Sequence, residues 1–550
     1  MHQISAHNAT KMDNITGYLN RNAIKFPDKP AILHPVVISF KKLDQEVDRY
    51  AAGLIISGIT KGTHTILLVS AGSEFFILCF ALLRIGAVPI IIDPGMGIRA
   101  MARALSGSDA RAFIGIPKTH LLKYLYPRSF RKVRIWIHTG RAWMPGSKPS
   151  FSLRKDIELP GPQCNMKSNE LAAVFFTSGS TGPPKGVIYN AGMLEAQVRM
   201  MEEHFKYGPE EIDLCTFPLL GLFVTCLGSS LVIADMDPLR PASLNPEKLI
   251  KNLNVHRCTQ MFGSPTILNR LVRYAKNNDV KLITLRRVIS AGAPVPLDLQ
   301  KAFLKLSIGH AEIHTPYGAT EALPVTDITA TELMQQTEEE SSYSGGICVG
   351  YSLPGLVVKI IVISDGPLHA WSDDLVLPVG DVGEIVVKGA HVSQEYKNNT
   401  HANELAKILD SSDGGIWHRM GDVGRMDENG RIWFYGRKNH RVIAASGTLF
   451  TIPTEAVFNQ HPDVMRTALV GVTVPGQKFK KPVICIQTES EIDERKFPEL
   501  KQELLELCYR NELTKDIRHI FFHKNFPVDP RHNAKIFREK LAVWAERRVK

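Results

Sequence analysis

Short apolar runs rich in β-branched residues alternate with helical patterns through the first three-quarters of the chain. Seven such runs are TILLVS, VPIIID, ARAFIGI, LAAVFFTS, SLVIAD, CTQMFG and LRRVISAG. Runs that are apolar on both faces, instead of alternating with polar residues, are typical of parallel strands buried between helices. The pattern therefore predicts an α/β fold whose parallel sheets are covered by helices.

Length and a change of pattern divide the chain. With 550 residues it is too long for a single hydrophobic core. From Val357 the sequence becomes β-rich, and after GRKNHRV a compact tail of alternating strand and helix patterns follows. We expect a large N-terminal domain of several subdomains over residues 1–438 and a small α+β C-terminal domain over residues 439–550.

The segment Ile66–Ile92 is the one stretch that resembles a membrane helix. It is interrupted by Pro89 and contains Glu74 and Arg84, and each charge would cost about 2.5–3.5 kcal/mol at the centre of a bilayer. A strand, a helix and a second strand explain the same residues without that cost. We therefore predict that this segment belongs to the buried core.

Charge and cysteine spacing narrow the functional classes. The formal net charge is +11, which suits anionic ligands or an acidic surface, but no nucleic-acid module accompanies it, so we expect no nucleic-acid partner. The most basic stretch, Lys123–Arg141, contains interleaved aromatic residues. A solvated surface strand and loop is the favoured interpretation, and contact with a partner or a membrane surface stays open.

The eight cysteines show neither zinc-binding nor CxxC spacing. We interpret them as small buried apolar residues in a reducing compartment. The first residues lack the apolar core of a signal peptide. These features predict a cytoplasmic protein, and peripheral membrane association stays open.

A loop rich in hydroxyls and glycines follows the apolar run Leu171–Phe176. Its glycines allow the backbone to turn amides inward, and its hydroxyls add further donors, so it can form a concave anion site. Lys185 supplies a point charge suited to phosphate. A Walker A loop is excluded because Gly186 stands where that motif needs serine or threonine. The loop is a phosphate loop of another kind.

The string TSGSTGPPKG resembles the signature of the adenylate-forming superfamily, which includes acyl- and aryl-CoA synthetases, peptide-synthetase adenylation domains and luciferases. One further motif of that superfamily, ALLRIGAVPIIIDP, precedes this loop. Six others follow it in order: SAGAPV, YGATE, GEIVVKG, HRMGDVG, GRKNHRV and RHNAKIFREKL. The resemblance spans essentially the whole chain. It implies ATP and Mg²⁺ as cofactors and a small mobile C-terminal domain that swings about a hinge. Asn439 takes the hinge position, where aspartate or lysine is usual.

The resemblance implies three residues that act in the transfer itself: Thr320 at the α-phosphate, Glu321 as the Mg²⁺ ligand, and Lys535 in the terminal lysine motif. Attack of a carboxylate on ATP is opposed by repulsion between two anions, and nearby cations reduce it. A preorganised donor such as Lys535 is worth about 3–4 kcal/mol. A solvated basic helix face is the alternative for Lys535.

Other residues are implied to hold the nucleotide and the acyl chain. Tyr317 offers a flat apolar face to adenine, Asp422 can accept both ribose hydroxyls, and Arg437 can reach the ribose or phosphate unless it is only a surface ion-pair residue. The residues implied to bind ATP are Thr177, Ser178, Gly179, Ser180, Thr181, Gly182, Lys185, Gly292, Ala293, Pro294, Tyr317, Gly318, Ala319, Asp422 and Arg437. Those implied to line the acyl pocket are Phe217, Leu220 and Phe223, in a stretch without the histidine found in many acyl-CoA ligases.

Two features of the sequence concern the second half-reaction, in which the acyl group leaves AMP. The segment between Gly447 and Pro453 is one residue longer than the common GxxIxPxE pattern, in a region that guides the thiol in thioester-forming members, so thiol transfer is in doubt. The strings DPGMG, AFIGIPKTHL, GIWHRMGDVG, GTLFTIPTEAVFN and RHNAKIFREKLAVWAER resemble one branch, the olefin β-lactone synthetases of bacterial long-chain olefin biosynthesis.

That branch implies adenylation of a long-chain 2-alkyl-3-hydroxy fatty acid with release of pyrophosphate. The 3-hydroxyl then attacks the acyl carbon to give a β-lactone and AMP, and other enzymes of the olefin pathway are implied partners. The alternatives are a long-chain fatty-acid–CoA ligase, and a non-catalytic nucleotide-binding, lipid-binding or membrane-surface assembly protein. His314, His391, His418 and His440 lie near motifs, but none is assigned as the general base of the second step.

Overall fold

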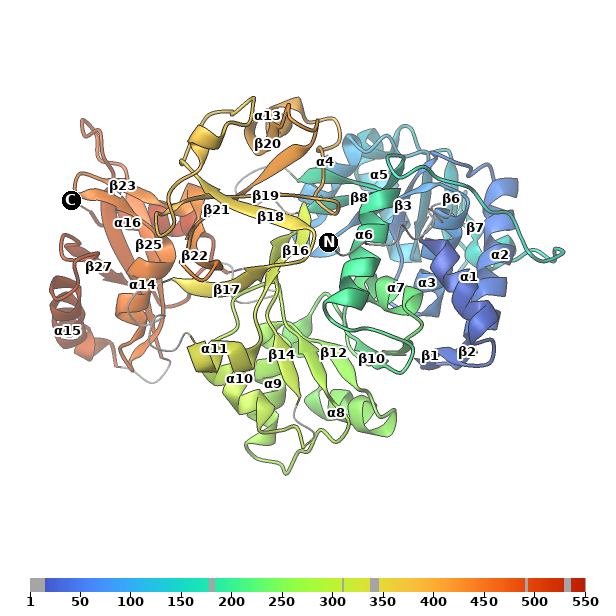
Figure 1. The fold of residues 1–550 in the computed structure, drawn as a ribbon, viewed down its shortest axis with the longest axis horizontal. Coiled ribbons are helices and arrows are strands. Elements are labelled where there is room, and N and C mark those ends of the chain that lie inside the picture. The colour runs from blue at the N-terminus through green and yellow to red at the C-terminus, as the bar shows by residue number, and fades with distance from the viewer. Residues whose placement is uncertain are drawn as a thin grey trace, which may run out of the picture.

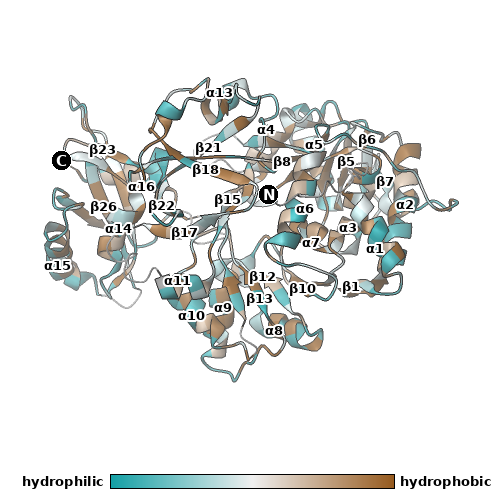
Figure 2. Ribbon diagram, viewed as in Figure 1, coloured by the Kyte–Doolittle hydropathy of each residue, from teal (hydrophilic) through white to brown (hydrophobic). Residues whose placement is uncertain are grey.

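The structure is a computed structural model that describes residues 15–177, 184–308, 311–336, 346–489, 493–528 and 536–549 (Figure 1). Two seven-stranded sheets, an eight-stranded sheet and two small C-terminal sheets make up its framework. Apolar residues concentrate on the strands and on the sides of helices that face them (Figure 2). The predicted α/β class is confirmed.

The first sheet has the order β7-β6-β5-β3-β4-β8-β9, and its strands are parallel except for the antiparallel pair β8 and β9. Its strands are β3 (His64–Leu68), β4 (Val88–Ile92), β5 (Ala112–Gly115), β6 (Ile135–His138), β7 (Lys148–Pro149), β8 (Leu171–Thr177) and β9 (Lys185–Asn190). Helix α3 (Ser73–Arg84) connects β3 to β4 and is buried along most of its length. The prediction of strand, helix and strand over Ile66–Ile92 is therefore confirmed.

The charge at the end of α3 is paired. The Arg84 guanidinium lies 2.5 Å from a carboxylate oxygen of Asp44 and 2.5 Å from one of Asp48, both on α2 (Phe40–Ile56). Among the described residues, no helix is long and apolar enough to cross a membrane. Seven of the eight cysteines are buried, Cys164 is half-buried, and all eight are free, in agreement with their predicted role as apolar core residues.

The second sheet has the order β14-β13-β12-β10-β11-β1-β2 and is parallel apart from the short edge strand β2. Its strands are β1 (Pro30–His34), β2 (Ile38–Ser39), β10 (Ile212–Cys215), β11 (Ser230–Ile233), β12 (Gln260–Phe262), β13 (Arg287–Ile289) and β14 (Glu312–His314). Helix α1 (Thr16–Lys25) precedes β1. The helices between β9 and β17 are α6 (Ala191–Glu203), α7 (Pro218–Cys226), α8 (Pro246–Val255), α9 (Pro265–Ala275), α10 (Leu297–Leu304) and α11 (Ala330–Gln336).

The third sheet is antiparallel, and most of its strands lie in the segment after Val357 that the sequence predicts to be β-rich. It comprises β15 (Tyr317–Ala319), β16 (Ala322–Asp327), β17 (Ile347–Ser352), β18 (Leu356–Ile361), β19 (Gly383–Gly389), β20 (Lys407–Leu409), β21 (Ile416–Met426) and β22 (Arg431–Arg437). Helix α13 (Thr400–Ala406) leads directly into β20. Residues 337–345, an acidic stretch, lie outside the described residues.

The C-terminal part follows a turn of 3₁₀ helix at Lys438–His440. It contains β23 (Val442–Ala444), β24 (Gly447–Leu449), α14 (Thr451–Asn459), β25 (Val464–Val472), β26 (Lys481–Thr488), α15 (Phe497–Tyr509), β27 (His519–Phe522) and α16 (Arg538–Glu546). Leu541 on α16 is fully buried in this part's own core, with Ile536 and Trp544 packed against the same cluster. The division of the chain after residue 438 stays a prediction.

Candidate active site

A β-hairpin flanks the predicted phosphate loop. Thr177 ends β8 and pairs in register with Lys185, the first residue of β9. Ser178, Gly179, Ser180, Thr181 and Gly182, all predicted to bind ATP, lie outside the described residues. The hairpin fixes Lys185 at the base of this loop, and its ammonium nitrogen lies 4.9 Å from the centre of the Tyr396 ring.

Glu321 is held by two residues of one segment, Ser393 and Tyr396. The Tyr396 hydroxyl donates a hydrogen bond of 2.7 Å to Glu321 Oε1, and the backbone amide of Ser393 donates one of 2.7 Å to the carbonyl oxygen of Glu321. Beside it, the Tyr189 hydroxyl donates a 2.6 Å hydrogen bond to the carbonyl oxygen of Thr320. Thr320 and Glu321 are thus fixed at the turn between β15 and β16, facing the segment that carries Lys185.

Lys407 adds a second cation that the sequence patterns do not reveal. Its side chain is buried, its ammonium group lies 5.3 Å from the centre of the Tyr396 ring, and it donates a hydrogen bond to the carbonyl oxygen of Ser393. Burial lowers the pKa of Lys407 to about 7, with Glu321 acting against that shift and Lys185 adding to it. Tyr396 therefore makes cation–π contacts with two lysines while its hydroxyl is bonded to Glu321.

The predicted nucleoside-binding residues also come together. The Tyr317 hydroxyl donates a 2.6 Å hydrogen bond to Asp422 Oδ2, and Arg437 Nη1 lies 3.1 Å from Asp422 Oδ1. Arg437 Nη1 also donates to the carbonyl oxygen of Met420 at 3.1 Å. Burial raises the pKa of Asp422, whereas Arg437 and the Tyr317 hydroxyl act to lower it. Arg437 is therefore paired with Asp422. This is what we expect of an ion-pair residue, the alternative role of Arg437, but the pair also borders the candidate nucleotide site.

The two remaining loops lie at the ends of strands. Gly292, Ala293 and Pro294 follow β13, and Gly292 has a φ of +93°, in the left-handed region that favours glycine. In the acyl-pocket segment, Phe217 precedes α7 and is 42% exposed, and its ring lies 5.7 Å from that of Phe262. Leu220 and Phe223 lie on α7 and are partly buried against the core.

The hinge region lies directly after Arg437. Asn439 is exposed within the 3₁₀ turn. Helix α14 lies so close to strand β22 that a Cβ on Gly436 would lie 2.1 Å from the Thr451 hydroxyl oxygen. Gly436 also has a φ of +123°. Lys535, the predicted catalytic lysine, lies outside the described residues.

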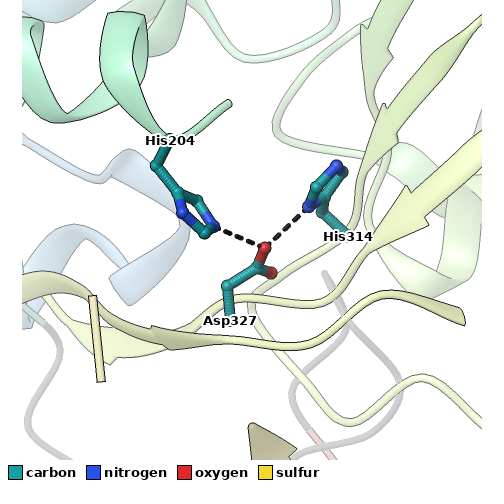
Figure 3. A group of neighbouring side chains, drawn as sticks. All are labelled: His204, His314 and Asp327. Carbon is teal, nitrogen blue, oxygen red and sulfur yellow. Dashed lines mark hydrogen bonds and ion pairs between the residues drawn. The ribbon is translucent and has the colours of Figure 1, made fainter. Parts of the chain in front are cut away.

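A histidine–aspartate–histidine clamp is formed by His204, Asp327 and His314 (Figure 3). His204 Nε2 lies 2.9 Å from Asp327 Oδ2, and His314 Nδ1 lies 2.6 Å from the same oxygen. These residues come from the end of α6, the end of β14 and the end of β16. Thr315 reinforces the clamp, since its amide and hydroxyl donate to the carbonyl oxygen of Ile328 at 2.9 and 3.0 Å.

The clamp is a hydrogen-bonded structural unit. Burial raises the pKa of the Asp327 carboxyl, but the hydrogen bonds to His204 and His314 outweigh that effect and hold the pKa below its ordinary value. Two histidines and a carboxylate could also hold a metal ion, but one nitrogen of each ring is already bonded to a single carboxylate oxygen. His314 therefore positions the chain that leads to Tyr317.

Comparison with known proteins decides the family. Residues 19–397 match the family described as "AMP-binding enzyme". The chain belongs to this family. It is 40% identical to an olefin beta-lactone synthetase of Xanthomonas campestris over 98% of both chains, and 39% identical to one of Stenotrophomonas maltophilia over 97% of this chain and 98% of that relative.

A more distant relative and two solved structures agree with the fold. An acyl-CoA ligase of Ajellomyces capsulatus, SID4, is 25% identical over 82% of this chain and 78% of its own. The solved amide bond synthetase McbA of Marinactinospora thermotolerans has a TM-score of 0.78 at 22% identity, covering 96% of this chain and 99% of McbA. The o-succinylbenzoate CoA synthetase of Bacillus subtilis, solved with AMP, has a TM-score of 0.75 at 20% identity. The match covers 97% of this chain and 98% of the synthetase.

The predicted superfamily and enzyme class are therefore confirmed: this AMP-binding enzyme is an adenylate-forming ligase. Its individual site residues stay predictions. Sequence patterns missed Tyr396 and Lys407, which join the site through long-range contacts. Tyr396 lies seven residues after the GEIVVKG motif, and that proximity is too weak to assign it a role. Lys407 follows a helical pattern, where a lysine is expected to be solvated.

The clamp predicts a pH-dependent contribution to stability. Asp327→Ala leaves two histidines without their buried acceptor and should lower the free energy of unfolding by about 3–5 kcal/mol. Because folding depresses the pKa of Asp327, its contribution is present above the unfolded-state pKa near 3.8 and is lost as the pH falls through the folded-state pKa. Urea denaturation as a function of pH measures the difference.

The exposed pair His34 and Asp235, 3.0 Å apart, is the matched control. Asp235→Ala should cost less than about 1 kcal/mol because solvent screens an exposed pair. Equal losses for the two aspartate variants would contradict a structural role for the clamp.

Proposed function

We propose that this enzyme adenylates a long-chain 2-alkyl-3-hydroxy fatty acid and closes the acyl-adenylate to a β-lactone. The observation that carries the proposal is the 40% identity, over 98% of both chains, to an olefin beta-lactone synthetase. The acyl-CoA ligase SID4 is only 25% identical over a smaller share of each chain.

In the first step a carboxylate oxygen attacks the α-phosphorus of ATP, and pyrophosphate leaves. Two anions must approach each other, so positive charge near the phosphates lowers the barrier. Lys185, at the base of the phosphate loop, and Lys407, behind Tyr396, supply that charge on one side. Tyr317 and Asp422 would hold the adenine and ribose on the other, and Lys535 would stabilise the charge that moves between carboxylate and phosphate.

The donor set around Glu321 suits a magnesium ion. Its side chain is half-buried, and Oε1 accepts the Tyr396 hydrogen bond, so the carboxylate is oriented before an ion binds. Carboxylate and phosphate oxygens are the ligands that Mg²⁺ prefers. When bound, the ion would neutralise phosphate charge, while Lys185 and Tyr396 orient the groups around it.

In the second step the 3-hydroxyl oxygen of the same acyl group attacks the acyl carbon. A carbon–oxygen bond of the lactone ring forms, the bond from the acyl carbon to AMP breaks, and the hydroxyl proton is transferred to AMP or to water. The nucleophile is tethered, which raises its effective concentration without a second binding site. The extra residue between Gly447 and Pro453, where β24 runs into α14, is compatible with an altered thiol path.

The choice of nucleophile can be tested directly. With ATP, Mg²⁺ and a synthetic 2-alkyl-3-hydroxy acid, the enzyme should form β-lactone and AMP at the same rate with and without CoA. Mass spectrometry of the products and an AMP assay measure this. The matched 2-alkyl acid without the hydroxyl should be adenylated but give no lactone. Strict dependence on CoA with a thioester product would instead identify an acyl-CoA ligase.

Lys535 is predicted to act in the adenylation step. Lys535→Ala should reduce pyrophosphate release by about 100-fold or more, while ATP binding stays detectable by calorimetry. The neighbouring Lys540→Ala, on the same basic segment, is the control and should retain activity. Unchanged release in Lys535→Ala would show that another lysine performs this role.

Tyr396 is predicted to orient Glu321. Tyr396→Phe keeps the ring that contacts the two lysines but removes a hydrogen bond to a charged acceptor, worth about 1.5–3 kcal/mol. The Mg²⁺ concentration for half-maximal pyrophosphate release should therefore rise at least about tenfold. Tyr435→Phe removes a buried hydroxyl bonded to Arg425, outside the site, and should leave the Mg²⁺ dependence unchanged. The same Mg²⁺ dependence in both variants would contradict this role.

A further inference from the structure

The positive charge of the chain is concentrated in one segment. Between Ala110 and Lys155 there are eleven lysines and arginines and no aspartate or glutamate. The whole chain has 66 basic and 55 acidic residues, so the remainder has 55 of each and is neutral. This segment therefore carries the entire formal net charge of +11.

The segment forms one edge of the first sheet, which Figure 1 shows at the opposite end of the molecule from the C-terminal part. It includes β5, β6 and β7 and the crossover between β5 and β6, which contains α5 (Leu122–Leu125). Nine of the eleven basic side chains are exposed. Within the described part of the chain, only Lys132, with Asp109, and Arg154, with Glu46, form ion pairs. The other nine cations form no ion pair with a carboxylate of the described residues.

Apolar side chains project from the same segment. Leu122 of the crossover is buried, whereas Leu121, Tyr124 and Leu125 are 54, 63 and 66% exposed. These three positions have the spacing i, i+3 and i+4, which places them on one face of a helical turn, directed away from the core. Large apolar residues on an outward face contribute nothing to folding and need another explanation.

A second loop lies beside this turn. Lys123 Nζ donates a 3.2 Å hydrogen bond to the carbonyl oxygen of Pro145, and it lies 4.9 Å from the centre of the Trp136 ring. The loop around Pro145 carries Trp143, which is 84% exposed. Leu121, Tyr124, Leu125 and Trp143 are here called the apolar tip, and the exposed basic side chains of Ala110–Lys155 the basic face.

We propose that the basic face and the apolar tip form a docking surface for an anionic lipid bilayer. Lysines and arginines without carboxylate partners are attracted to anionic headgroups. Leucine, tyrosine and tryptophan are the residues that enter the interface between headgroups and acyl chains. A nucleic acid would satisfy the basic face but not Leu121 and Leu125. A bilayer satisfies both features and leaves the distant C-terminal part clear of the membrane.

Docking would serve the proposed function, because an acid with two long alkyl chains partitions into bilayers. The binding itself does not depend on that reaction, so the two proposals can fail separately.

Vesicle sedimentation with the full-length protein tests the surface. The protein should sediment with phosphatidylcholine vesicles that contain phosphatidylglycerol and not with pure phosphatidylcholine, and added salt should weaken binding. The combined change Lys118→Gln, Arg128→Gln, Arg131→Gln and Arg141→Gln should weaken binding at least about tenfold. The control Lys251→Gln, Arg273→Gln, Lys276→Gln and Lys305→Gln alters four exposed cations of the second subdomain and should bind as the wild type does.

The apolar tip is tested separately. Leu125→Ala with Trp143→Ala should weaken vesicle binding severalfold without changing its salt dependence, and all variants should retain wild-type pyrophosphate release with a short soluble acid, which shows that they are folded. Equal loss in the two four-residue variants, or no binding to anionic vesicles, would overturn the proposal. Full binding by the apolar-tip variant, or tighter binding to single-stranded RNA than to vesicles, would show a general polyanion surface instead.

Discussion

The candidate active site depends on holding like charges together. Lys185 and Lys407 both contact the ring of Tyr396, and their ammonium groups would repel each other without the anion beside them. Glu321 supplies part of that compensation through the Tyr396 hydroxyl. An ATP molecule would supply the rest, because its phosphates carry more negative charge than one carboxylate. The free site is therefore short of negative charge, which favours binding of a polyanion.

This cluster forms where the first and third sheets meet. Lys185 comes from the first sheet, and Tyr396, Lys407 and Glu321 come from the third sheet and its connections. The Asp327 clamp links the same junction to the second sheet through His314 and to α6 through His204. A buried carboxylate bonded to two histidines tolerates little displacement, so it fixes the register of the chain that carries Tyr317 and Glu321.

The strands and helices that single continuous segments form could be predicted from the sequence. The buried parallel strands and the order strand, helix and strand over Ile66–Ile92 follow from local pattern. Tyr396 and Lys407 could not be predicted, because their roles arise from contacts with Glu321 and Lys185 that span 75 residues or more, as in the Tyr396–Glu321 hydrogen bond. Lys407 is buried because α13 ends and β20 begins at this point, a boundary that no local pattern marks.

Positive charge has two different forms in this molecule, and they should respond differently to solution conditions. In the candidate active site Lys407 is buried and Lys185 is half-buried, and both lie near the Tyr396 ring, so salt screens the interactions of these two cations weakly. On the basic face most cations are exposed and have no carboxylate partner, so their attraction to an anionic surface falls steeply with ionic strength. Association with a membrane could thus be reversed by salt while adenylation chemistry continues. The cations of the candidate active site and those of the proposed docking surface lie in separate parts of the fold.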